Sequence, residues 1–172
     1  MSQAIGVAAA LLIGGGAGVQ IAMLAAVGRD RGTFEASWIS MLGTLFGGTV
    51  FLAISALRGN APLLPTPFDR APIYVLVGIL AGVGLLLSAR RLDPYFAIMG
   101  LFGLGVISGA AFLGPRIGIG LFLSAMIAGQ MVMALALDHI GAFGVDVRQV
   151  DFVRLAGVGM LLLGVVLVQG RD

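Results

Sequence analysis

Cysteine and lysine are absent from this chain of 172 residues, and charge is scarce. Without cysteine there are no disulfides, thiolate metal sites or cysteine nucleophiles. The single histidine, His139, cannot form a histidine cluster by itself. Charged residues make up 10% of the chain, whereas a soluble domain carries about 25%. A surface so poor in charge predicts a surrounding medium other than water, and we expect that medium to be a lipid bilayer.

The basic residues do not indicate nucleic-acid binding, although the calculated pI is near 9.9. All ten are arginines, and they are scattered through the polar connections without a basic run or interleaved aromatic residues. A nucleic-acid interface would gather such residues on one face or along one helix. We therefore expect no nucleic-acid partner.

Long apolar segments dominate the chain, which is 59% hydrophobic with a mean hydropathy of +1.10. A spanning helix needs about 20 mostly apolar residues, and a barrel strand only about 9–11 alternating ones. Window length thus favours helices. The sequence predicts an all-α, polytopic transmembrane bundle in one domain, 1–172, with helices at about 4–27, 36–57, 73–89, 95–113, 117–137 and 152–168.

Charge is cleanly separated from these windows, since Arg154 is the only charged residue inside one. Its long side chain can reach the headgroups from the first turn of the last helix. The window at 73–89 is the shortest, so a five-span protein in which it lies at the membrane surface is the alternative. Arginines divide almost evenly between the two sides of a six-span topology, so the positive-inside rule barely selects an orientation.

Glycine is abundant, at 28 residues, and much of it recurs every fourth position along the predicted helices. In lipid, small residues at this spacing allow helix backbones to approach closely. The same smooth faces would also let helices slide, as a transporter requires. The residues predicted to form these helix-packing ridges are Gly14, Gly18, Gly43, Gly47, Gly78, Gly82, Gly105, Gly109 and Gly129, the last together with Ala125.

Gln20 and Gln130 are the most polar residues deep within the windows. Each lies seven residues before the end of its window, or roughly 10 Å at about 1.5 Å per residue. With six spans, the two amides lie at one depth near the same face. Either they hydrogen-bond between helices and hold the bundle together, or they line a polar cavity and bind substrate. Ser124 and Thr44 are weaker candidates for the wall of that cavity.

Charged side chains at the window ends are candidates for gates or anchors, namely Arg116, Asp138 and Glu35. Glu35 either couples transport to protons or simply suits the positive end of a helix dipole. A hydrolase using His139 with Asp138 or Ser124 is disfavoured, because adjacent helical residues do not face each other and Ser124 is about four turns away. We therefore expect no enzyme, no metal and no cofactor.

Several short motifs, in this order, resemble the YdcZ family, a half-size branch of the drug/metabolite transporter superfamily. They are GVQ at 18–20, GR at 28–29, SMLGT at 40–44, GPRIG at 114–118, AGQ at 128–130, LDHIG at 137–141 and RLAG at 154–157. Two features depart from the family pattern: Leu24 stands where the family has asparagine, and the window at 73–89 looks like an addition to five spans.

The resemblance implies a small-molecule transporter in the bacterial inner membrane. Larger members of that superfamily contain two such halves in opposite orientation, with the substrate site between them. The resemblance therefore implies a homodimer that works by alternating access on an unidentified substrate. A scaffold or accessory subunit that binds a larger partner through glycine-rich faces is the rival interpretation. A cavity reaching both glutamines would favour transport.

Overall fold

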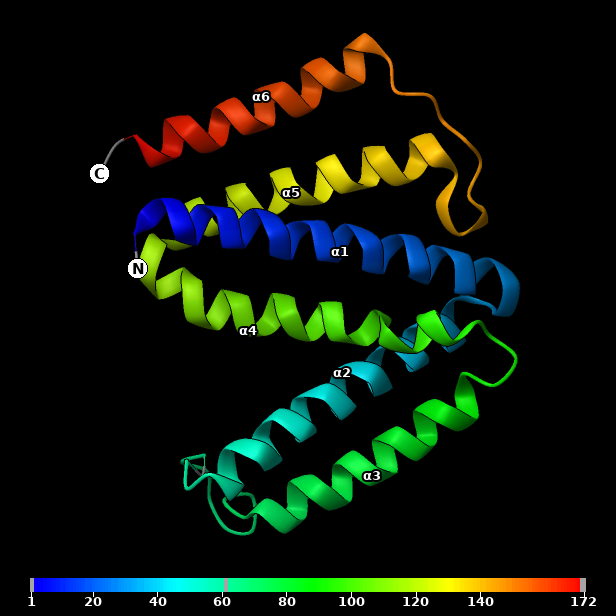
Figure 1. The fold of residues 1–172 in the computed structure, drawn as a ribbon, viewed down its shortest axis with the longest axis vertical. Coiled ribbons are helices and arrows are strands. Elements are labelled where there is room, and N and C mark those ends of the chain that lie inside the picture. The colour runs from blue at the N-terminus through cyan, green and yellow to red at the C-terminus, as the bar shows by residue number, and fades with distance from the viewer. Residues whose placement is uncertain (1, 61, 171–172) are drawn as a thin grey trace. The chain divides into compact units, whose positions relative to one another are not determined.

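The structure is a computed structural model that describes residues 2–60 and 62–170, and its described part consists of helices and their connections (Figure 1). The long helices are α1 (Gln3–Arg31), α2 (Thr33–Leu57), α3 (Ala71–Ser88), α4 (Met99–Ile117), α5 (Ile119–Ile140) and α6 (Phe152–Gln169). Two short 3-10 helices, η1 (Pro94–Ile98) and η2 (Ala142–Gly144), precede α4 and follow α5.

Six helical segments in the described residues are long and apolar enough to cross a bilayer, with η1 and α4 together forming one of them. The all-α, polytopic transmembrane fold expected from the sequence is confirmed, with six candidate spans. Their outward surfaces carry large apolar side chains such as Leu12, Phe51 and Leu86. Because backbone groups in a helix satisfy one another, such surfaces can face acyl chains.

The turns are tighter than the apolar windows indicated. α1 continues through the polar residues after Val27 to Arg31, and only Gly32, where φ is +96°, separates it from α2. α4 likewise continues through Pro115, and the break falls at Gly118, where φ is +86°. At these two turns the helix ends where φ is positive and not where the sequence becomes polar, and glycine adopts that conformation without a Cβ penalty.

The described chain divides into two compact units. Unit 1 comprises most of α1, the second half of α4, and α5 and α6; unit 2 is 27–104, with the end of α1, all of α2 and α3, η1 and the start of α4.

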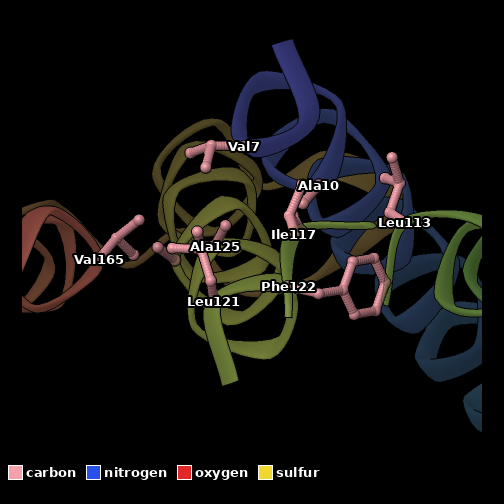
Figure 2. Packing of buried hydrophobic residues seen from close by; sticks show 9 residues of the cluster. Val7, Ala10, Leu113, Ile117, Leu121, Phe122, Ala125 and Val165 are labelled. Atoms are coloured by element: carbon pink, nitrogen blue, oxygen red, sulfur yellow. The ribbon is translucent and has the colours of Figure 1, made fainter. Parts of the chain in front are cut away.

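The core of unit 1 lies where α1, α4, α5 and α6 contribute buried apolar side chains (Figure 2). Phe122 of α5 is 2% exposed, and Ala10 and Ala125 are completely buried. Val165 is the α6 member of this cluster. α6 packs beside α5 (Figure 1) but buries only 6% of its apolar window, so most of its surface is left for lipid or another protein.

In unit 2, α2 and α3 pack side by side along their length (Figure 1). A Cβ on Gly78 would lie 3.1 Å from Thr49 Oγ1, and one on Gly82 would lie 3.1 Å from the Phe46 ring. Ile39 and Met99 are fully buried. Glycines on α3 thus bring it close to the side chains of α2.

Candidate functional site

In unit 1, α1 and α5 approach each other very closely. A Cβ on Gly14 would lie 1.9 Å from the Met126 carbonyl oxygen, and one on Gly129 would lie 2.0 Å from the Leu11 carbonyl oxygen. Real Cβ atoms do not approach that closely, so only glycine fits at both places. The two backbones touch directly, which is how small residues allow helices to associate in lipid.

Other predicted ridge glycines differ in how much space surrounds them. A Cβ on Gly18 would lie 3.0 Å from the Gln130 carbonyl, one on Gly47 would lie 2.5 Å from Leu101, and one on Gly109 would lie 2.5 Å from Ile13. Gly43 packs on Gly100, with 3.1 Å from its hypothetical Cβ to the Gly100 Cα.

Gly105 differs from the other ridge glycines, because a Cβ there would meet no atom within 4 Å. Steric crowding by the described residues therefore does not require glycine at this position.

A groove of about 260 Å³ runs beside the α1–α5 contact. Its lining is apolar: Leu11, Leu12, Gly15, Gly16, Gly129, Val132 and Met133. Neither Gln20 nor Gln130 contributes to it. The groove therefore suits an apolar group, and it is not the polar cavity that would join the two glutamines.

Both glutamines belong to unit 1 and are half-buried. The main chain of Gln130 forms part of the α1–α5 contact, because its amide nitrogen lies 3.0 Å from a Cβ built on Gly14. Gln20 follows Ile13 by seven residues, so the two share a face of α1, and Ile13 contacts Gly109 of α4.

Each glutamine lies near the middle of its helix. Gln130 is ten residues before Ile140 and Gln20 is eleven before Arg31, or about 15 Å and about 16.5 Å from the carboxyl ends of α5 and α1. Both amides thus lie in the middle part of helices that are long enough to cross a bilayer.

The two hydroxyl candidates are engaged with backbone carbonyls. Ser124 Oγ donates to the Gly120 carbonyl within α5, at 2.8 Å. Thr44 Oγ1 donates to the carbonyls of Gly100, at 2.8 Å, and Ser40, at 3.0 Å. Thr44 belongs to unit 2, where it joins α2 to α4, whereas Ser124 belongs to unit 1.

Two of the predicted gate residues act locally at helix ends in the structure. Arg116 donates to the Phe112 carbonyl and lies over the Phe112 ring, with 3.6 Å from Cζ to the ring centroid. The Asp138 carbonyl accepts from the Arg148 amide at 2.9 Å. His139 Nδ1 accepts from the Val150 amide at 3.3 Å. Asp138 and His139 thus anchor the connection between α5 and α6.

Glu35 belongs to a polar network that the sequence did not reveal. Its Oε1 accepts from Arg31 Nη1 at 3.0 Å, and Arg31 also donates to the carbonyls of Ser88, at 3.0 Å, and Arg90. Trp38 Nε1 donates to Ser88 Oγ at 3.1 Å. The i, i+4 spacing of Arg31 and Glu35 was visible in the sequence, but both residues fell in the connection 28–35 between the predicted helices, although both are helical in the structure.

These features define a multi-pass helical membrane protein whose spans pack through glycine and carry few polar groups at depth. Comparison with known families places it more narrowly. Residues 5–167 match the family model described as "Putative inner membrane exporter, YdcZ", and the chain belongs to this family, as its motifs had indicated. It is therefore a multi-pass protein of the bacterial inner membrane. No curated protein and no solved structure matches it.

The family match extends over residues 73–89, the range that looked like an addition to a five-span pattern, because the matched residues 5–167 include α3.

The family is one of membrane exporters, which is not an enzyme class.

Proposed function

We propose that this protein moves a small molecule across the inner membrane as a homodimer, by alternating access, with Gln20 and Gln130 contacting the substrate. The single observation that carries the proposal is the mid-helix position of the two amides in a chain of an exporter family. Transporters place substrate sites near the bilayer midplane. A primary amide offers both donor and acceptor there, so the pair suits a neutral, hydrogen-bonding group.

The other predicted site residues take supporting roles in this proposal. Ser124, which belongs to unit 1 with both glutamines, would form a wall of the path and can exchange its backbone acceptor for a substrate oxygen. Thr44, in unit 2, is a separate and weaker candidate for a substrate contact. Arg116 would anchor the end of α4 at the membrane interface, and Asp138 would anchor the end of α5. The membrane-spanning parts of these helices would move while their ends stay fixed. All spans and connections of the chain would act as one transmembrane domain in each protomer.

The dimer is inferred from the size of the chain and from its balance of charge. Superfamily relatives place the site between two halves of opposite orientation, and one chain here has the size of one half. The near-even division of arginines between the two sides suits insertion both ways round. The exposed face of α6, with only 6% of its window buried, leaves surface for a second copy.

The test is uptake into proteoliposomes, using a panel of radiolabelled amino acids, sugars and organic cations. For any compound transported by the natural chain, Gln130→Leu should lower the rate at least about tenfold, because the variant leaves a substrate polar group without its partner. Gly120→Ala, on the same helix as Gln130, is the control, because a Cβ there meets no atom within 4 Å. Unchanged rates in Gln130→Leu for every transported compound would remove the glutamine from the site.

The groove beside α1 and α5 favours a second candidate, a non-transporting scaffold. Its lining includes Gly15, Gly16 and Gly129 and excludes both glutamines, as a surface that receives a partner helix would. The same reconstitution decides between the two functions. A scaffold yields no uptake of any compound above empty vesicles.

A further inference from the structure

Carbonyl groups at the carboxyl end of α3 accept hydrogen bonds from a side chain of another helix in unit 2. The last carbonyl groups of a helix lack amide partners within it, and they carry the negative end of the helix dipole. At a membrane interface, water only partly reaches such groups, so donors from the protein are needed. For α3 the relevant carbonyls are those of Ser88, its last residue, and Arg90, two residues beyond.

Arg31 supplies these donors. Its guanidinium donates to Ser88 O and Arg90 O while also pairing with Glu35. Its side chain is 20% exposed, whereas that of Glu35 is 43% exposed. The planar fork of a guanidinium can reach several acceptors at once, which a lysine ammonium cannot do with the same geometry. The arginine thus sits between three segments: the end of α1, the start of α2 and the end of α3.

Trp38 adds a second connection one turn further along α2. Its indole nitrogen donates to Ser88 Oγ, while 55% of its surface stays exposed. Trp38 is therefore both an interfacial aromatic residue, as tryptophan commonly is, and a partner of the end of α3. Both connections meet at Ser88, so they act on the same point.

We infer that Arg31 is a clamp that fixes the carboxyl end of α3 to the α1–α2 turn, with Glu35 orienting the guanidinium. The carbonyl bonds, rather than the ion pair, provide the holding force, because an exposed ion pair contributes little by itself while donors to helix-end carbonyls replace lost solvation. In the transport cycle, a consequence that rests on the proposed function, α2, α3 and the last turn of α1 then move together.

Thiol labelling in nanodiscs tests the clamp without any substrate, so its result is independent of transport. The chain has no native cysteine, and Ala89→Cys places one thiol between the two clamped carbonyls. Labelling with a membrane-impermeant maleimide should accelerate at least about tenfold in Arg31→Gln, the factor expected when charge-assisted hydrogen bonds are lost. Glu35→Gln should change the rate less than threefold, because the carbonyl bonds remain.

Two comparisons keep the test decisive. Asp146→Cys, in the exposed connection between α5 and α6, should label at the same rate with and without Arg31→Gln. Arg31→Lys preserves charge without the fork and should accelerate Ala89→Cys labelling by an intermediate factor, which covers the case in which Arg31→Gln does not fold. An unchanged rate in both Arg31 variants overturns the clamp. Equal acceleration in Glu35→Gln and Arg31→Gln assigns the holding force to the ion pair and also overturns it.

Discussion

The two units solve the same packing problem with different chemistry. In unit 1, α1 and α5 meet backbone to backbone through Gly14 and Gly129, with an apolar groove beside them. In unit 2, helices are joined by side-chain hydrogen bonds from Arg31, Trp38 and Thr44. No hydrophobic force drives helices together in lipid, so they associate through close backbone approach and hydrogen bonding. Unit 1 relies more on close approach, and unit 2 relies more on hydrogen bonds.

The difference is one of degree, because unit 2 also contains a glycine contact. A Cβ on Gly100 would lie 2.3 Å from the Ser40 carbonyl oxygen. The same close approach brings Thr44 within reach of the Gly100 carbonyl. In unit 2 the small residue thus makes the polar bond available, whereas in unit 1 the glycine contact is flanked by apolar side chains.

The largest effect should come from Gly14→Ala, which tests whether unit 1 depends on backbone contact. The added methyl group would collide with the Met126 carbonyl and force α1 away from α5. Over-packing of this kind costs about 1–3 kcal/mol, or a fall in Tm of up to about 12 °C at 2–4 °C per kcal/mol. Thermal unfolding in detergent, followed by circular dichroism, measures it.

Gly15→Ala is the matched control for that experiment. Its Cβ would meet Met133 Cε at 3.6 Å, an ordinary contact, and the substitution improves helix propensity. We expect a Tm equal to or slightly above that of the natural chain. Equal losses in Gly14→Ala and Gly15→Ala would mean that the close contact does not hold unit 1 together.

Thr44→Val should have an intermediate effect and tests the polar side of the comparison. It removes the hydroxyl that bonds to Gly100 O while keeping the shape of the side chain. Hydrogen bonds between membrane helices contribute about 0.6 kcal/mol on average, and up to about 2 kcal/mol, so Tm should fall by about 1–8 °C. The same unfolding assay applies, and a rise in Tm would show that the bond is not stabilising.

Gly157→Ala and Gly164→Ala on α6 should have the smallest effect on folding. Neither Cβ would meet an atom within 4 Å, and alanine favours helix by about 0.5–1 kcal/mol over glycine. We expect Tm to stay level or rise by about 2–4 °C. Cross-linking in vesicles provides the second readout: loss of the cross-linked dimer in these variants, with Tm preserved, would locate the second copy at α6.

The sequence predicted the spans well, because length and hydropathy are local properties and bilayer thickness is constant. The turns were harder to predict. Gly32 and Gly118 end their helices by backbone conformation, whereas the apolar windows stop at 27 and 113, before the helices end at Arg31 and Ile117. This error also concealed the Arg31 clamp, since a residue assigned to a loop has no defined face.

The sequence could indicate which residues are candidates for the site, but it could not indicate how they are arranged in space. A polar residue in an apolar window is conspicuous, so Gln20, Gln130, Ser124 and Thr44 could be found from sequence. Hydrogen-bond partners could not be predicted in the same way, because they are distant in the sequence. Thr44 bonds to Gly100, 56 positions away, and Arg31 of the clamp bonds to Ser88, 57 positions away.

Composition and hydropathy alone determined that this chain lies in a bilayer as a bundle of helices, since each span satisfies its own backbone. Only the tertiary structure decided which glycines touch a neighbouring backbone, as Gly14 does, and which lie open, as Gly105 does. A glycine carries no side chain to indicate its surroundings, and the space around it is set by another helix.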